Sequence, residues 1–184
     1  MRVAFLSDIH CNLQAWRAVR DDMATRRVDQ IVCLGDVVGN GPSPAVVLKE
    51  VHETVDHFVL GNHDAVVAGS VDPNHFHAMA RQLILYSCNR LSDRARRFFR
   101  NLPLVYESTE FSCSHASPAH PEHFAYVDSE QEARRAWERA PHAVHFTGHT
   151  HDPILYELTP DGRVTSTRPE REAIPLDPGC RYLI

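Results

Sequence analysis

The chain has 184 residues, of which 43% are hydrophobic and 23% are charged, and its formal net charge is −5. This composition is typical of a folded globular protein and excludes wholesale disorder, and the negative charge does not favour nucleic acid as a partner. We expect a single domain over residues 1–184. The 5 cysteines form no close pair, and we find neither a signal-peptide core nor a membrane-spanning apolar run, so we predict free thiols in a cytoplasmic protein without a membrane partner.

The amino-terminal part alternates between short apolar runs and segments of helical periodicity. Buried strands are predicted at residues 3–6, 30–34 and 57–60. A helix is expected after Asn12, and a second helix starts at Pro44 behind Ser43 as its N-cap. Strands that alternate with helices in this way predict a parallel sheet with right-handed crossovers.

The rest of the chain is first helical and then rich in strands. Helices are predicted over residues 76–87, 92–100 and 129–139, the last opened by a capping box from Ser129 to Glu132. Residues 104–106 and 111–113 form a predicted hairpin, 143–147 a strand, and 154–158 and 163–167 a second hairpin. The fold class that accommodates both parts is α/β, with a two-sheet β-sandwich and flanking helices.

Residues of the types that bind metal ions follow the predicted strands. In an open α/β sheet, ligand sites form where strands end, because the strand core fixes the loop that follows. Two residues separated by one lie on the same side of an extended segment, so both members of an Asp-x-His or His-x-His pair can reach one ion. The segments are Asp8-Ile-His10, Gly35-Asp36, Gly61-Asn62-His63-Asp64, His115 and Gly148-His149-Thr150-His151.

Taken together and in this order, these segments resemble the motifs of the calcineurin-like metallophosphoesterase family. The stretches 7–16 and 35–44 are most similar to a branch of small prokaryotic phosphoesterases of broad specificity. The resemblance implies that Asp36 bridges two metal ions, that His63 faces the substrate, and that Asp64 orients the ring of His63. It also implies the remaining metal ligands: Asp8, His10 and His151 for one ion, and Asn62, His115 and His149 for the other.

The ligand types suit two divalent transition-metal ions, that is Mn, Fe, Ni, Co or Zn, better than Mg. Two such ions lower the pKa of a shared water and supply a bridging hydroxide that can attack a phosphate ester. His63 is then available as a general acid, or it stabilises charge in the transition state. The implied activity is hydrolysis of phosphodiesters, including cyclic nucleotides, or of small phosphomonoesters, with a small phosphate ester as the partner.

Other functions of the same fold remain open from the sequence: a non-catalytic scaffold, a protein Ser/Thr phosphatase or a nuclease. The segments 37–41 and 58–60 lack the arginines of the Ser/Thr phosphatases, and the retained ligand types favour an enzyme over a scaffold. Cys11 stands where the most similar branch has glycine, and we expect its thiol not to bind metal. Related proteins continue beyond a segment like 181–184, so we expect the C-terminal strand and tail to be missing here. If the chain ends naturally at Ile184, its last strand is expected to be an exposed edge.

Overall fold

The computed structural model describes residues 1–169 and 173–184. It divides the chain into two compact units, Met1–Pro103 and Leu104–Ile184, each with its own sheet. The prediction of an α/β chain with two sheets is confirmed, whereas the prediction of a single domain remains a prediction. Among the described residues, no helix is long and apolar enough to cross a membrane.

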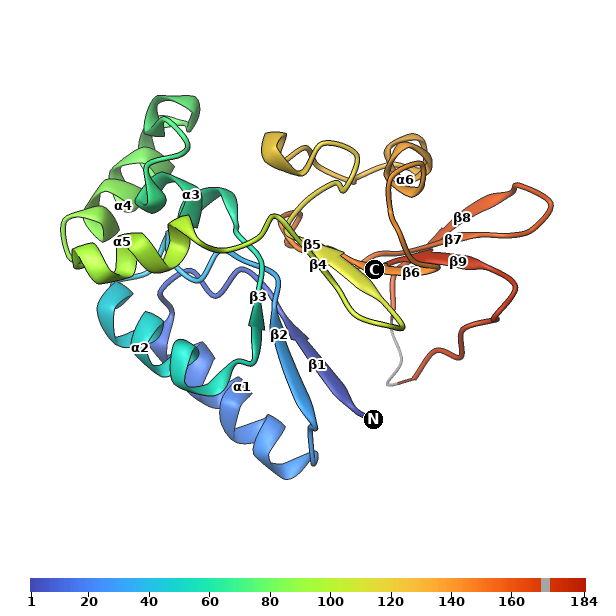
Figure 1. Cartoon of the computed structure of the whole chain (residues 1–184), viewed down its shortest axis with the longest axis horizontal. Helices are drawn as coiled ribbons and strands as arrows, with labels where there is room; N and C mark the ends of the chain where they lie inside the picture. Colours follow the sequence, from blue (N-terminus) through green and yellow to red (C-terminus); the bar gives the residue numbers. More distant parts are fainter. Residues whose placement is uncertain (170–172) are drawn as a thin grey trace. The chain divides into compact units, whose positions relative to one another are not determined.

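The first unit contains a parallel sheet in the order β1-β2-β3, formed by Val3–Leu6, Gln30–Cys33 and His57–Phe58. Helices α1 (Leu13–Thr25) and α2 (Pro44–Thr54) connect these strands and lie along them in Figure 1. The side chain of Asn12 caps α1 by accepting from the Ala15 amide at 3.0 Å. Ser43 precedes α2 as predicted but makes no capping hydrogen bond with its side chain.

Three further helices complete the first unit: α3 (Asn62–Ala68), α4 (Ala78–Cys88) and α5 (Asp93–Arg100). The predicted helix over 76–87 corresponds to α4, preceded by the short 3-10 turn η1 (Pro73–His75). The predicted strand at 57–60 is shorter than expected, because only His57 and Phe58 pair with β2; the amide of Leu60 donates to Pro103 at 2.8 Å. We did not predict α3, whose first turn contains the Asn-His-Asp motif.

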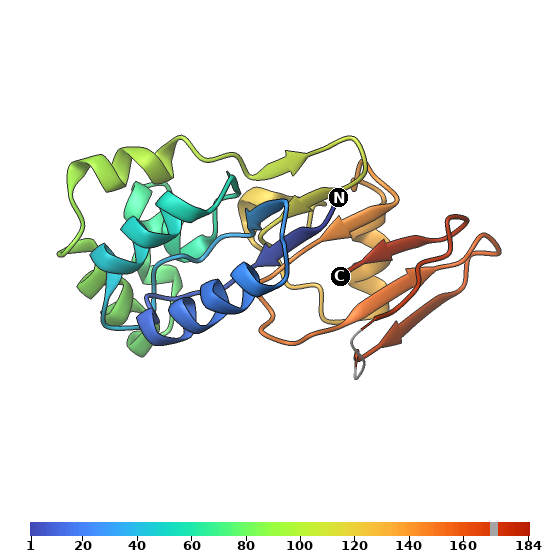
Figure 2. The ribbon, with the colours of Figure 1, turned by 90° about the horizontal axis from the view of Figure 1, so that it is seen from below.

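The second unit contains a mixed sheet in the order β4-β5-β6-β9-β7-β8. Both predicted hairpins are present, and helix α6 (Glu130–Trp137) lies beside the strands of this sheet (Figure 2). Ala133, Ala136 and Trp137 of α6 belong to a buried cluster with strand residues. The strands are β4 (Val105–Glu107), β5 (Ser112–Ser114), β6 (Val144–Phe146), β7 (Leu155–Leu158), β8 (Val164–Thr167) and β9 (Arg181–Leu183).

The expectation of an exposed last strand is wrong. Strand β9 pairs with β6 in parallel and with β7 in antiparallel orientation, so it lies inside the sheet. Tyr182 and Leu183 are accordingly buried, at 4% and 1% exposure. Both neighbours already satisfy its backbone groups, so β9 offers no free edge for pairing with another copy.

Five thiols and the imidazole of His145 are among the buried side chains of the two units. All 5 cysteines are free, as predicted, and all are buried; burial raises the pKa of Cys113 to about 12. His145 on β6 is fully buried between Ser112 and Ser114, whose hydroxyls lie 2.7 and 2.9 Å from its two ring nitrogens. Burial, followed by the charges of His142 and Arg181, lowers the pKa of His145 from 6.5 to about 3.

His145 should therefore make the free energy of unfolding depend on pH. The unfolded chain takes up this proton near pH 6.5 and the folded chain only near pH 3, so stability is full above about 6.5 and is lost as the pH falls between these values. His145→Gln removes the titration, and its unfolding free energy should fall less steeply from pH 6.5 to 4, by up to about 1.4 kcal/mol per pH unit. Urea unfolding at several pH values measures this slope. The control His75→Gln should keep the wild-type slope, and a wild-type slope in His145→Gln would contradict the assignment.

Candidate metal centre

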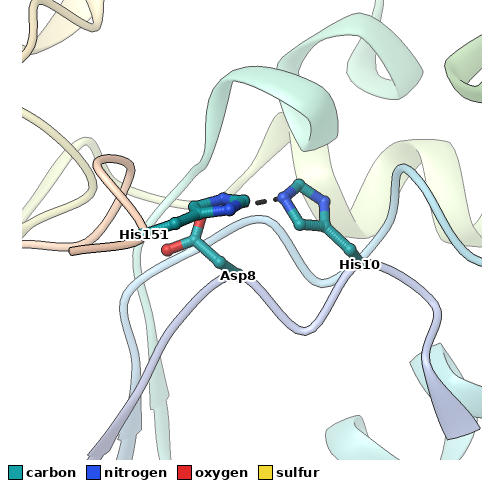
Figure 3. A group of neighbouring side chains, drawn as sticks. All are labelled: Asp8, His10 and His151. Atoms are coloured by element: carbon teal, nitrogen blue, oxygen red, sulfur yellow. Dashed lines mark ion pairs between the residues drawn. The ribbon is translucent and has the colours of Figure 1, made fainter. Parts of the chain in front are cut away.

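The loops that follow β1 and β2 run side by side beyond the edge of the first sheet. The amides of Asp8, His10 and Cys11 donate to the carbonyls of Gly35, Asp36 and Val37 at 3.1, 2.9 and 3.0 Å. Figure 3 shows Asp8 and His10 on the first of these loops. The sheet thus positions three predicted ligands, Asp8, His10 and Asp36, at one place in the first unit.

The imidazole of His10 is oriented by the second loop. Its Nδ1 lies 3.2 Å from the carbonyl oxygen of Val38, which accepts a hydrogen bond from this nitrogen and thereby selects the tautomer protonated at Nδ1. The other nitrogen, Nε2, lies 3.8 Å from Oδ1 of Asp8 and 3.8 Å from Oδ2 of Asp36. A histidine that ligates metal is usually held in this way by a hydrogen bond from its second nitrogen.

Asp36 is buried, at 1% exposure, between two histidines. Its Oδ1 accepts from the backbone amide of His63 at 3.0 Å, while Oδ2 lies 3.8 Å from Nε2 of both His10 and His63. One donor atom each of His10, Asp36 and His63 lies within 4.8 Å of the other two. A buried carboxylate flanked by imidazoles fits a divalent transition-metal ion in charge and in donor chemistry.

Helix α3 brings the Asn-His-Asp motif to the same place. Asn62 and His63 are buried in its first turn, at 9% and 8% exposure. Gly61 precedes them, and a Cβ there would lie 2.1 Å from Oδ1 of Asp36. Only a glycine allows this approach, which explains the Gly-Asn-His spacing of the motif.

Asp64 has a role that the motif did not indicate. Its carboxylate is fully buried and accepts from the backbone amides of Val38 at 3.1 Å, Val37 at 3.3 Å and Gly61 at 3.4 Å. These bonds fix the loop that carries Asp36. Asp64 stands at the third position of α3, where its carboxylate accepts from the amide of the N-cap residue Gly61, which is one half of a capping box. An acidic residue at this position could have predicted both α3 and the contact with Gly61. The expected orientation of the His63 ring by Asp64 remains a prediction.

The second unit holds the other predicted ligands. His115 follows β5 and is 1% exposed, and its carbonyl accepts from the amide of Gly148 at 2.9 Å. The rings of His115 and His149 are 5.0 Å apart, and one nitrogen of each lies within 4.8 Å of the other. Tyr126 stacks on His149 at 4.1 Å, an aromatic contact that the sequence analysis missed. His151 lies in the same loop as His149.

The backbone is strained at the predicted ligands themselves. Among the described residues, eight that are not glycine have a positive φ, and five of them are predicted metal ligands: Asp8, His10, Asp36, His149 and His151, with φ between 48 and 68°. This region costs an ordinary residue of order 1–3 kcal/mol and persists where the surrounding structure requires it, typically at functional sites. The concentration of strain at these five residues supports the site that the motifs predict.

Cys11 also has a positive φ, but its thiol contacts protein groups that are not predicted ligands. It is fully buried with φ of 59°, its Sγ accepts from the Gly39 amide at 3.3 Å, and it lies 3.7 Å from the hydroxyl of Ser87.

Cys11→Gly should leave metal content unchanged and alter turnover by less than about tenfold, or about 1.4 kcal/mol. Metal analysis and steady-state kinetics test this, with Cys88→Ala as the control thiol. Loss of one ion from Cys11→Gly would show that the thiol is a ligand.

Comparison with known proteins identifies the family. A sequence model described as the calcineurin-like phosphoesterase superfamily domain matches residues 1–179, so the chain belongs to this superfamily. An uncharacterized protein of Methanocaldococcus jannaschii is 34% identical over 129 residues, which are 68% of this chain and 53% of that protein. The chain therefore spans about half the length of this curated relative.

Solved structures agree with this assignment. A metallophosphoesterase from Sphaerobacter thermophilus is 28% identical, with a TM-score of 0.81 over 100% of this chain and 74% of that one. A hypothetical protein from Pyrococcus horikoshii shares the fold, with a TM-score of 0.66, 20% identity, and coverage of 83% of this chain and 71% of the other. The predicted family and fold class are confirmed, and the described residues include groups of His and Asp side chains that could hold a metal ion.

Proposed function

We propose that this chain is a metal-dependent hydrolase of phosphodiesters, active also on small phosphomonoesters. The observation that carries the proposal is the left-handed backbone at five predicted ligands, because a protein that had lost metal binding would have no reason to keep this strain. The same observation argues against a scaffold that has lost its metal ions. The metallophosphoesterase from Sphaerobacter thermophilus, similar over the whole chain, supports the same class of activity.

The proposal assigns the metal ligands as the motifs indicate. The ligands are Asp8, His10, Asp36, Asn62, His115, His149 and His151, with Asp36 shared between two ions. When bound, the ions would activate water and offset the charge of the phosphate group. Within the first unit, the Val38 carbonyl and the Asp64 carboxylate hold the ligands His10 and Asp36 in place for this purpose.

The preference for diesters rests on the residues after Asp36 and on those between β3 and Gly61. Val37, Val38 and Val59 are all 0% exposed and pack into the core. These positions therefore provide no guanidinium group for the second negative charge of a monoester. A diester carries one negative charge less, so it depends less on such a group.

His63 is the residue we assign to proton transfer. It lies in the first turn of α3, with its backbone amide bonded to Asp36 and its ring against that of Phe76, at a centroid distance of 5.1 Å. In this place it can donate a proton to the ester oxygen of the leaving group, so that the group departs as an alcohol. A ribose or alkyl group needs this proton, because its alkoxide is a poor leaving group.

The experiment compares the purified protein with and without metal. After chelation, turnover of bis(4-nitrophenyl) phosphate should be abolished, and Mn, Ni or Co should restore it better than Mg. With metal restored, kcat/KM for this diester should exceed that for 4-nitrophenyl phosphate, and a panel of cyclic nucleotides extends the comparison. Full activity in excess chelator would reject metal dependence. Tight metal binding without hydrolysis of any ester would favour the scaffold.

A further inference from the structure

A separate group of metal-binding side chains lies on the loop between β5 and α6. The group consists of His120, Glu122 and His123. His120 is the N-cap of a 3-10 turn, η2 (Pro121–His123), which contains the other two residues. Oε1 of Glu122 lies 3.7 Å from Nδ1 of His120 and 3.9 Å from Nε2 of His123, and the two rings are stacked with centroids 5.5 Å apart. We propose that these three residues form a second, peripheral site for a divalent transition-metal ion.

The backbone of the loop holds the three residues together without a metal. Pro121 occupies the first position of η2, where its fixed φ suits the turn, and the amide of His123 donates to the carbonyl of His120 at 3.0 Å. The turn ends at Phe124 with φ of 50°, and the amide of Ser117 bonds to the carbonyl of Ala125 at 3.0 Å and closes the loop. Binding therefore costs little backbone entropy, because the backbone is already ordered.

The distances require only a small closure of the side chains. Zinc binds nitrogen and oxygen ligands at about 2.0–2.2 Å, so two ligands of a tetrahedral site are roughly 3.4 Å apart. The observed separations of 3.7 and 3.9 Å exceed this by a few tenths of an ångström. All three side chains are more than half exposed, so they are free to rotate by this amount.

The donor set defines the class of ion. Two imidazoles and one carboxylate suit Zn, Ni, Co or Cu, whereas Mg and Ca prefer sites built from oxygen alone. Three protein ligands also leave a position for water or for an external ligand. The loop carries Phe124 and Tyr126, whose rings contact those of His115 and His149, so an ion bound here would restrain the segment beside two of the predicted ligands.

The test is a calorimetric titration of the metal-free protein, residues 1–184, with Zn²⁺. His123→Ala should lose one binding event and keep the others, and Glu122→Gln should weaken the same event by at least about tenfold, since even an outer-shell contact contributes that much. His75→Ala is the matched control, because His75 also ends a 3-10 turn after proline but belongs to no such group of ligand side chains among the described residues. This control should bind like the wild type.

The proposed centre of the enzyme is tested separately in the same experiment. Asp36→Asn should disturb the other events and retain the one that depends on His123, which keeps the two assignments distinguishable. The peripheral site would be overturned if His123→Ala bound as many ions with the same affinities as the wild type. An equal loss in His75→Ala would also overturn it, because binding would then reflect exposed histidines in general.

Discussion

Replacing His63 by alanine should lower turnover of an alkyl or ribose phosphodiester by roughly 10²–10⁴-fold while both metal ions remain bound. The proximity of the His63 ring to Asp36, 3.8 Å between Nε2 and Oδ2, makes this variant decisive, because the same geometry would serve a metal ligand. If His63 is a metal ligand, His63→Ala loses an ion. If His63 is a general acid, His63→Ala keeps its metal content and its substrate affinity.

The leaving group separates proton donation from charge stabilisation. A nitrophenolate leaves readily without a proton, so the nitrophenyl ester should lose much less turnover in His63→Ala than an alkyl or ribose ester. Both esters are to be assayed with the wild type and the variant, and the metal content is determined alongside. Equal losses on both esters with metal retained would reject proton donation in favour of charge stabilisation. Loss of metal would reject the assignment altogether.

Asp64→Asn should lower turnover less than His63→Ala does. The carboxylate of Asp64 accepts from the amides of Val37, Val38 and Gly61, and asparagine retains only one oxygen for these bonds. The loop that carries Asp36 should loosen, so turnover should fall less than in His63→Ala and both esters should be affected alike. A loss limited to the alkyl ester would instead support the direct orientation of the His63 ring.

Replacing Asp36 by asparagine should remove metal from both positions of the proposed centre and lower turnover by at least about 10²-fold. The bound ions are expected to contribute several kcal/mol of transition-state stabilisation, and the loss of their shared carboxylate removes most of it. Asparagine has nearly the same shape, and its amide oxygen can still accept from the amide of His63. The change therefore tests the charge and the ligand atom, not the fold.

Metal analysis, steady-state kinetics and unfolding of the metal-free proteins together check this result. The metal-free variant should be at least as stable as the metal-free wild type, because it no longer buries a carboxylate at 1% exposure. Asp56→Asn is the matched control: its carboxylate also accepts from a backbone amide, that of Ile31 at 2.8 Å, but it is exposed. Normal metal content in Asp36→Asn would exclude Asp36 as a shared ligand.

The sequence by itself determined which superfamily this chain belongs to and which residue types its motifs contain. The spacing of Asp8 and His10, and of His149 and His151, together with the glycines before Asp36 and Asn62, identified the family. Periodicity and turn residues also predicted the parallel sheet and both hairpins, because these elements form between neighbouring segments with strong local signals. Motifs and local patterns are properties of short stretches of chain, so the sequence is sufficient to find them.

Only the tertiary structure decided how distant residues act on one another. Three such contacts are the bond from His10 to the Val38 carbonyl, the bonds from the amides of Val37 and Val38 to Asp64, and the contacts of His145 with two serines. Each of them joins segments that are far apart in the chain. The sequence also did not predict that β9 lies between β6 and β7. The residues of β9 alone do not indicate which strands pair with it. Such pairings depend on which surfaces pack and which backbone groups remain to be satisfied, and a local pattern does not contain this information.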